Sequence, residues 1–185
     1  MDKYLVKDLM VPISEYATVS EGSTLLDAVL ALEKAQEIFD HSQYLHRAIL
    51  ILDKNKRVIG KVSQLDTLRA LEPKNEQLDK IEDISRYGFS QKFIMCLREQ
   101  NRLKDVSMED MCLAAAGLKV EKLMQAPTEG EFIDENASVN IAIHQLVRGS
   151  HMSLLVTREK DIVGILRTSD VFYAVFHTMK ACKLA

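Results

Sequence analysis

The chain has 185 residues, of which 47% are hydrophobic, and a formal net charge of −3. This composition excludes the disordered and fibrous classes and suits one compact domain or two small domains that share an interface. The small net charge gives no global electrostatic reason to expect nucleic acid or an acidic membrane as a partner.

The three cysteines are widely spaced and show no Cys-x-x-Cys pattern, so neither a disulfide framework nor a zinc site is predicted. The histidines also lack metal-ligand spacing, and we predict no metal site. The first twelve residues carry Asp2 and Asp8 and contain no long apolar stretch, which resembles neither a signal peptide nor a membrane span. We therefore expect a cytoplasmic protein with reduced thiols.

The first half of the chain predicts a strand around Val19, a helix, a pair of strands and a second helix. The first helix is indicated by apolar residues at the i, i+3, i+4, i+7 spacing of one helix face, after polar residues at 20–24. Its apolar residues are Leu25, Ala28, Val29 and Leu32. Two apolar runs at 48–52 and 58–60, joined by a charged turn, predict a hairpin of largely buried strands. A short helix from Asp66 to Leu71 follows.

An insert occupies residues 72–119, between the two halves. Apolar spacing predicts two helices in it, the first through Phe89, Phe93, Ile94 and Leu97 and the second through Met108, Met111, Cys112 and Ala115. Ser107 and Asp110 resemble a capping box for the second helix. Because its charges nearly cancel, we expect the insert to pack on the rest of the chain or to form a partner surface, and not to read DNA.

The second half repeats the first. Val6-Lys7-Asp8-Leu9-Met10 recurs 114 positions later as Val120-Glu121-Lys122-Leu123-Met124, and a helix face with the same spacing follows at Val139, Ala142, Ile143 and Leu146. The strand pair recurs at 152–156 and 162–164, now 104 positions later, and the last helix runs from Asp170 to Lys180. The first half therefore has ten extra residues within 33–47, which predict a longer helix and a loop through Asp40-His41-Ser42-Gln43.

Each half ends its strand pair with Gly-apolar-apolar-x-x-x-Asp. The first copy reads Gly60-Lys61-Val62-Ser63-Gln64-Leu65-Asp66 and the second reads Gly164-Ile165-Leu166-Arg167-Thr168-Ser169-Asp170. Two tandem units of this order resemble the cystathionine-β-synthase (CBS) domain family. The chain departs from the family pattern at Lys61, where an apolar residue is usual, and at Arg167, where Ser or Thr is usual and the hydroxyl of Thr168 is displaced by one position.

The resemblance implies an α/β (α+β) fold with two units of strand-helix-strand-strand-helix order, related by a pseudo-twofold axis and paired so that clefts lie between them. We expect residues 1–71 and 120–185 to form the two units of one module, with a helical insert at 72–119. The family also stacks modules through helices, which implies a homodimer. The last helix is apolar on more than one side, so it is a candidate dimer surface; packing within one chain is the alternative.

The resemblance further implies an adenosine-containing ligand such as AMP, ADP or ATP. In the family, the Asp accepts hydrogen bonds from both ribose hydroxyls, and the Ser or Thr and the helix start approach phosphate. A carboxylate has two acceptor oxygens for a vicinal diol, and the free N–H groups of a helix start favour an anion. The Gly lets ligand and strand backbone come close.

Carried over by position, the first site takes Asp66, Ser63 and Thr18, and the second takes Asp170 and Thr168. The phosphate charge there is assigned to basic residues before the central strands or the last helix, namely Arg167, His46, Arg47 and His151.

Both sites also have a purely structural interpretation. Ser63 and Asp66 have the spacing of a capping box, which stabilises a helix by about 1 kcal/mol without any ligand. Arg167 and Asp170 have the spacing of a salt bridge within one helix turn.

We expect a regulatory module that senses an adenine nucleotide and signals to a separate, unknown protein; such a module needs no cofactor beyond that ligand. The alternative is a dimerisation or interaction scaffold whose clefts are degenerate. An enzyme is not expected, because the sequence has no G-x-x-x-x-G-K-[ST], G-x-S-x-G or H-E-x-x-H motif.

Overall fold

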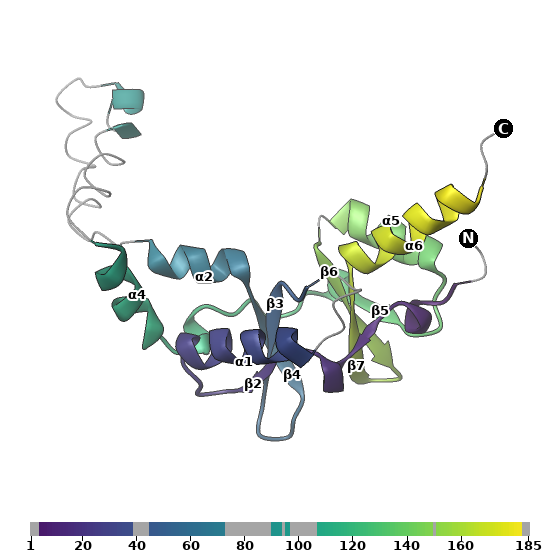
Figure 1. Cartoon of the computed structure of the whole chain (residues 1–185), viewed down its shortest axis with the longest axis horizontal. Coiled ribbons are helices and arrows are strands. Elements are labelled where there is room, and N and C mark those ends of the chain that lie inside the picture. The colour runs from purple at the N-terminus through teal and green to yellow at the C-terminus, as the bar shows by residue number, and fades with distance from the viewer. Residues whose placement is uncertain are drawn as a thin grey trace.

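The computed structural model describes residues 4–38, 45–72, 90–93, 95–96, 107–149 and 151–182. They form two sheets that lie side by side, each with its own helices (Figure 1). The first unit contains β2 (Thr18–Ser20), α1 (Leu25–Ile38), β3 (Ala48–Leu52), β4 (Val58–Ser63) and α2 (Gln64–Leu71). The second contains β5 (Phe132–Asp134), α5 (Val139–Gly149), β6 (Ser153–Arg158), β7 (Asp161–Arg167) and α6 (Thr168–Ala181). The predicted fold class, with its repeated strand-helix-strand-strand-helix order, is confirmed.

The two sheets have the same internal pairing. In each unit, the strand before the first helix runs parallel to the central strand, which pairs antiparallel with its hairpin partner. The strand order is β2-β3-β4 in the first sheet and β1-β7-β6-β5 in the second. The extra strand β1 (Val11–Pro12) comes from the amino-terminal end of the chain and pairs antiparallel with β7.

The repeated Val-x-x-Leu-Met segments are exchanged between the units. Each begins with a short 3₁₀ helix, η1 (Val6–Asp8) or η4 (Val120–Lys122). Val6 is fully buried in the core of the second unit, and Val120 is fully buried in that of the first. Each segment thus completes the core of the half to which it does not belong in sequence. The unit boundaries at residues 71 and 119 stay a prediction.

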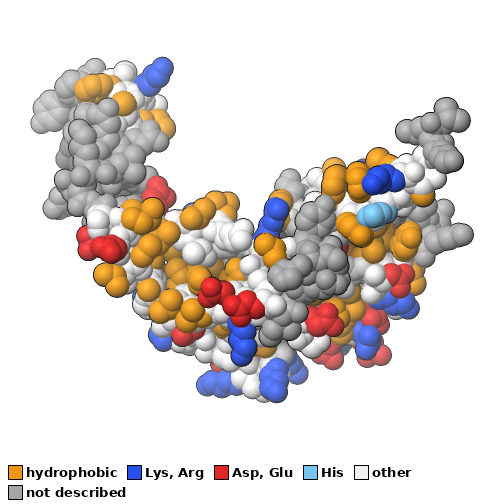
Figure 2. All heavy atoms as spheres, in the orientation of Figure 1, with side chains coloured by type: hydrophobic (Ala, Val, Ile, Leu, Met, Phe, Trp, Pro, Cys, Tyr) orange, Lys and Arg blue, Asp and Glu red, His pale blue; other side chains and the backbone are white. Residues whose placement is uncertain are grey.

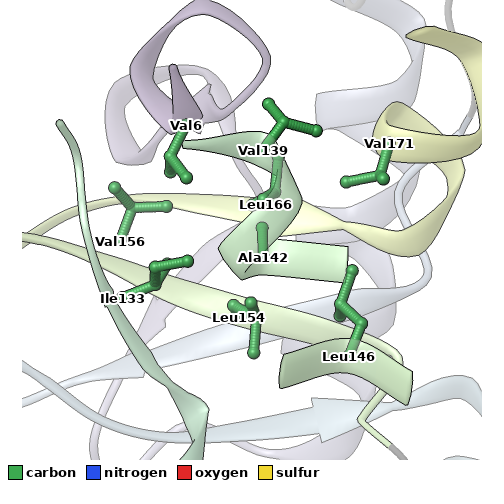
Figure 3. Packing of buried hydrophobic residues seen from close by; sticks show 9 residues of the cluster. All are labelled: Val6, Ile133, Val139, Ala142, Leu146, Leu154, Val156, Leu166 and Val171. Atoms are coloured by element: carbon green, nitrogen blue, oxygen red, sulfur yellow. The ribbon is translucent and has the colours of Figure 1, made fainter. Parts of the chain in front are cut away.

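The core of the second unit shows this exchange directly. Val6 lies among side chains from α5, β6, β7 and α6 (Figure 3). The other members of the cluster are Ile133, Val139, Ala142, Leu146, Leu154, Val156, Leu166 and Val171. A third cluster lies between the two sheets and contains Val11, Tyr16, Leu50, Leu155 and Ile165. Since burial of apolar area stabilises by about 25 cal/mol per Å², these contacts hold the two units face to face.

The glycine of each closing motif makes room for an exchanged segment. A Cβ at Gly164 would lie 2.8 Å from both the Met10 Sδ and the backbone oxygen of Val11. A Cβ at Gly60 would lie 2.7 Å from the Met124 Sδ and 3.2 Å from the backbone oxygen of Gln125. We expected these glycines to admit a ligand; in the structure the close neighbour is protein.

The second insert helix and its cap are confirmed. Helix α4 (Met108–Ala116) begins after Ser107, whose Oγ accepts a hydrogen bond from the Asp110 N–H. Ala115 of this helix is buried in the core of the first unit, so this part of the insert packs on the module as expected. The predicted helix through Phe89 and Leu97 falls largely outside the described residues.

The extra residues of the first half lengthen its helix, as predicted. Helix α1 has 14 residues and its counterpart α5 has 11. The predicted loop at 40–43 lies outside the described residues.

The helices leave large apolar side chains exposed on the outer surface of both units (Figure 2). On α6, Val171 is buried in the core, whereas four neighbours on the same helix are exposed: Phe172, Tyr173, Phe176 and Met179. One side of this helix therefore packs within the chain, and the dimer surface expected on its exposed side stays a prediction.

Substitution of Gly164 tests the exchanged arrangement. Gly164→Ala should destabilise the protein by about 1–3 kcal/mol, because the new methyl group meets backbone that cannot move independently. Gly117→Ala is the matched control, since a Cβ at Gly117 has nothing within 4 Å among the described residues. Urea unfolding of both variants measures the difference. Equal stability of the two variants would show that the crossing at Gly164 is not tight.

Candidate functional site

Asp66 lies at the junction of β4 and α2, where the chain turns from strand to helix. The Ser63 N–H and Oγ donate to Asp66 Oδ2 at 2.9 and 2.5 Å, and the Asp66 N–H donates to Ser63 Oγ at 3.2 Å. The predicted capping box is confirmed. Asp66 is buried by the strand and helix that it connects.

The other carboxylate oxygen of Asp66 is held by two side chains from the surface. Gln125 Nε2 donates to Oδ1 at 2.7 Å and Arg69 donates to it at 3.2 Å. Burial raises the pKa of Asp66, but the hydrogen bonds from Ser63 and Gln125, together with the charge of Arg69, outweigh burial and hold the pKa below its usual value. The carboxylate is therefore ionised at neutral pH and able to accept hydrogen bonds.

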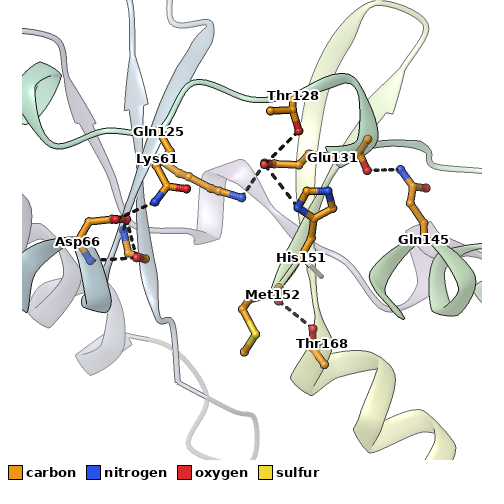
Figure 4. A network of polar contacts seen from close by, with 11 residues as sticks. Lys61, Asp66, Gln125, Thr128, Glu131, Gln145, His151, Met152 and Thr168 are labelled. Carbon is orange, nitrogen blue, oxygen red and sulfur yellow. Dashed lines mark hydrogen bonds and ion pairs between the residues drawn. The ribbon is translucent and has the colours of Figure 1, made fainter. Parts of the chain in front are cut away.

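A buried ion pair between the units continues from this point (Figure 4). Lys61 Nζ on β4 lies 2.6 Å from Glu131 Oε2, at the end of the short helix η5 (Glu129–Glu131) of the second unit. Glu131 Oε1 accepts from Thr128 Oγ1 at 3.4 Å and lies 3.6 Å from His151 Nδ1. Lys61 also exchanges two backbone hydrogen bonds with Gln125. A continuous network thus joins Asp66, Gln125, Lys61 and Glu131. We call these four residues and Ser63 the Asp66 cluster.

Asp170 occupies the equivalent junction of β7 and α6, but its carboxylate is locked by one buried residue. Arg167 Nε donates to Asp170 Oδ2 at 2.8 Å and Arg167 Nη2 donates to Oδ1 at 2.5 Å. The side chains of both residues are at least 90% buried. The salt-bridge interpretation of this pair is confirmed.

Two aromatic rings complete what we call the Asp170 cluster: Tyr16, His46, Arg167 and Asp170. The ring of His46 is fully buried, lies 4.4 Å from that of Tyr16, and has its Nδ1 3.2 Å from Arg167 Nη1. Burial raises the pKa of Tyr16 to about 12. Burial and the neighbouring charge of Arg167 lower the pKa of His46 to about 4. Tyr16 and His46 come from the first unit, so this cluster also joins the two units.

The two clusters occupy equivalent positions of the repeat but differ in side-chain size. By the sequence offsets of 114 and 104, Tyr16 corresponds to Gly130, His46 to Ser150, and Arg167 to Ser63. Ser150 lies outside the described residues. In the sequence, the three bulkiest members of the Asp170 cluster therefore have small counterparts, of which Ser63 contacts Asp66. Among the described residues, the neighbour that a Cβ at Gly130 would meet is His151 Nε2, at 3.4 Å.

The remaining predicted site residues are dispersed. Strand β3 separates Thr18 from Ser63, because Thr18 pairs with Leu50 and Ser63 pairs with Ala48 on opposite sides of that strand. Thr168 begins α6, and its Oγ1 donates to the Met152 backbone oxygen at 3.0 Å.

The basic residues assigned to one phosphate site lie in three separate places. His46 and Arg167 lie in the Asp170 cluster, His151 contacts Glu131 in the other, and Arg47 is exposed just before β3. Their roles toward phosphate stay a prediction.

Sequence reasoning missed Tyr16, Gln125 and Glu131. The repeat held a signal for Glu131, because the offset of 114 aligns this carboxylate with Ala17, which is buried. A charge at a position that is apolar in the other copy needs a partner of opposite charge when it is buried. Lys61, the residue that departs from the closing motif of the first half, is that partner.

Cys96, Cys112 and Cys182 are free and exposed. Within the described ranges, no three His, Cys, Asp or Glu side chains are grouped as a metal site would require. In the same part of the chain, no helix has the length and apolar character needed to cross a membrane.

The buried imidazole of His46 predicts a pH-dependent stability. Because its pKa is lower in the folded chain, the unfolded chain binds the proton more readily. Stability is therefore complete above the unfolded pKa of about 6.5 and is lost as the pH falls toward 4. The full loss is roughly 3 kcal/mol. Urea unfolding at several pH values in this window measures it.

His46→Phe should flatten the pH dependence in this window, since Phe fills the ring space without a titrating group. His144→Gln, at an exposed position on α5, should follow the wild type. Parallel curves for the wild type and His46→Phe would contradict the assignment to His46.

The comparisons with known proteins agree with this architecture. A family model described as the CBS domain matches residues 6–73 and 120–177. The chain is similar in structure to CBSX2 in complex with AMP, with a TM-score of 0.60, 18% identity, and coverage of 94% of this chain and 97% of that one. No curated protein matches the sequence.

Two further structures are CBS domain-containing proteins of unknown function. For the protein from Bacillus anthracis str. Ames Ancestor, the TM-score is 0.59 at 19% identity, over 95% of each chain. For the protein from Kribbella flavida DSM 17836, the TM-score is 0.60 at 16% identity, over 94% of this chain and 98% of that one. At such identities these likenesses establish the fold.

Paired CBS domains are in general regulatory modules that bind ligands and do not catalyse reactions. The two regions matched by the family model coincide with the two repeats and together cover more than half of the sequence. The chain belongs to the CBS domain family.

Proposed function

We propose that this chain is a non-catalytic regulatory module that binds one adenine nucleotide (AMP, ADP or ATP) beside Asp66 and signals its presence to a partner protein. One observation carries the proposal. Ser63 stands beside Asp66 at the position that Arg167 fills beside Asp170, and in the repeat Gly130 corresponds to Tyr16. An AMP complex of the structural relative CBSX2 supports an adenosine-containing ligand.

The partners of Asp66 can be exchanged for a ribose at small cost. Gln125 is exposed, and the Arg69 side chain is 60% exposed. Both can leave Oδ1 and be solvated by water, and two ribose hydroxyls then donate to the carboxylate in their place. The start of α2 lies next to Asp66 and offers backbone N–H groups to a phosphate, and the Ser63 hydroxyl would donate to the phosphate in place of its bond to Asp66 Oδ2.

The Asp170 cluster opposes the same exchange. A ribose would have to displace Arg167, whose guanidinium would remain buried without its carboxylate. Breaking a buried ion pair in this way costs several kcal/mol. We therefore assign the nucleotide to the Asp66 cluster, with Asp66 and Ser63 as its principal ligands, and assign a structural role to Arg167, Asp170 and His46.

Ligand binding beside Asp66 can change the surface of the module through the segment that carries Gln125. Gln125, which a ribose would release, and Glu131 lie on one segment between the units. That segment ends at an open surface depression next to α5, lined by Gly130, Ile141, His144, Gln145, Arg148 and Gly149. If the nucleotide binds more tightly when this segment is in one position than in another, binding increases the population of that position. The partner protein would then recognise the changed surface.

We propose that the module acts as a homodimer through its helices. The exposed apolar side chains of α6, with those of α1 and α5, offer the surface that such an association would bury.

The scaffold alternative is favoured by one observation. In the described structure every carboxylate oxygen of Asp66 and Asp170 already has a protein donor. A thermal-shift series with AMP, ADP, ATP, NAD and S-adenosylmethionine separates the two functions. A ligand at 100 times its Kd adds about 2.7 kcal/mol of stability, whereas a flat response across all five ligands would favour the scaffold.

Asp66→Ala should abolish the nucleotide-induced stabilisation. It should also lower the intrinsic stability by about 1 kcal/mol, because the helix cap is lost. Thermal unfolding with and without AMP or ATP measures both effects.

Asp27→Ala is the matched control, because Asp27 and Thr24 form the same cap at α1. The Thr24 N–H and Oγ1 donate to Asp27 Oδ2 at 2.8 and 2.7 Å. This variant should lose a similar cap energy and keep the nucleotide response. Retained nucleotide stabilisation in Asp66→Ala would mean that Asp66 is only a cap.

A further inference from the structure

The Lys61–Glu131 pair is a departure from the pseudo-twofold symmetry of the module. The equivalent positions are Ile165 and Ala17, and both are buried and apolar. A buried ion pair is often no more stabilising than well-packed apolar residues of similar volume. Since the same backbone positions accept an apolar pair in the other half, stability alone does not account for two buried charges here.

The pair lies next to the proposed nucleotide site, on its inner side. Lys61 and Ser63 are two residues apart on β4, so their side chains leave the same face of the strand. Gln125 connects Lys61 to Asp66, because its backbone is hydrogen-bonded to Lys61 and its side chain donates to Asp66. The side chains of Lys61 and Glu131 are only 13% and 7% exposed. With ribose at Asp66 and phosphate at the start of α2, a base directed to the inner side would meet this buried pair.

The Asp170 cluster indicates that a flat ring fits at this depth. Tyr16 occupies the position equivalent to Gly130, and its ring packs in the cluster that includes Ile165, the counterpart of Lys61. A purine placed beside Gly130 would contact Lys61 and Glu131, in the same way that the Tyr16 ring packs in one cluster with Ile165, the counterpart of Lys61.

We infer that Lys61 and Glu131 read the hydrogen-bonding edge of the base, an inference that rests on the proposed function. An ammonium only donates and a carboxylate only accepts, so together they complement an edge with a donor beside an acceptor. On adenine, the exocyclic amine donates to Glu131 and the adjacent ring nitrogen accepts from Lys61. Thr128 and His151 contact Oε1 and orient the carboxylate so that Oε2 faces Lys61. The ammonium has three N–H groups and the carboxylate has about four acceptor sites, so both can bind the base while the Lys61–Glu131 pair stays intact.

Ligands without the donor test this assignment. AMP and ATP are each compared with the N6,N6-dimethyl counterpart, which has no N–H on the exocyclic nitrogen, by isothermal titration calorimetry. Losing a hydrogen bond to a charged group should weaken binding to the wild type by about 10- to 100-fold. The double variant Lys61→Ile/Glu131→Ala carries the residues of the other half at both positions, leaves no charge unpaired and should fold. It should bind each nucleotide and its dimethyl counterpart with equal affinity.

The outcomes separate this inference from the proposed function. If the wild type binds AMP or ATP and the dimethyl counterpart equally well, the base-reading role is wrong while nucleotide binding stands. If the double variant binds adenosine as the wild type does but loses affinity for ATP, Lys61 contacts phosphate and the inference is also wrong. If the wild type binds no nucleotide, the proposed function itself has failed.

Discussion

The exchange of the two Val-x-x-Leu-Met segments is the constraint on which the rest of the structure depends. Val6 and Val120 each complete the apolar core of the opposite unit, and each segment crosses a glycine of a closing motif. The units cannot separate without exposing both valines to water, which is unfavourable in proportion to the apolar area exposed. This linkage places the start of α2 against the segment before β5, and the start of α6 against the segment before β2.

The exchanged backbone is symmetrical, but the side chains that it brings together are not. At one junction the chain places two rings and a buried arginine, which join the units through Tyr16, His46 and the Arg167–Asp170 pair. At the other it places a polar network around Asp66. Both junctions join the units, and we propose that the one around Asp66 also binds the ligand. A repeat with two identical junctions would have to combine both roles at each site.

Much of the fold could be predicted from the repeat, because helix and strand spacing are local and recur in both halves. The Ser63–Asp66 cap and the Arg167–Asp170 salt bridge were also predictable, since their partners lie three residues apart. The exchange of the two segments could not be predicted, because the pairing of β1 with β7 joins distant residues and leaves no local pattern in the sequence. The separation of Thr18 from Ser63 by β3 could not be predicted for the same reason, since the strand order depends on pairing between distant strands.

We propose that the two junctions differ in function, with one open to a nucleotide and the other closed by its own side chains. Native mass spectrometry of the chain with a saturating adenine nucleotide counts the bound ligands. We expect one nucleotide per chain, also within a dimer. Two nucleotides per chain would show that Arg167 and the rings of Tyr16 and His46 leave the second junction when ligand is present, and would contradict it.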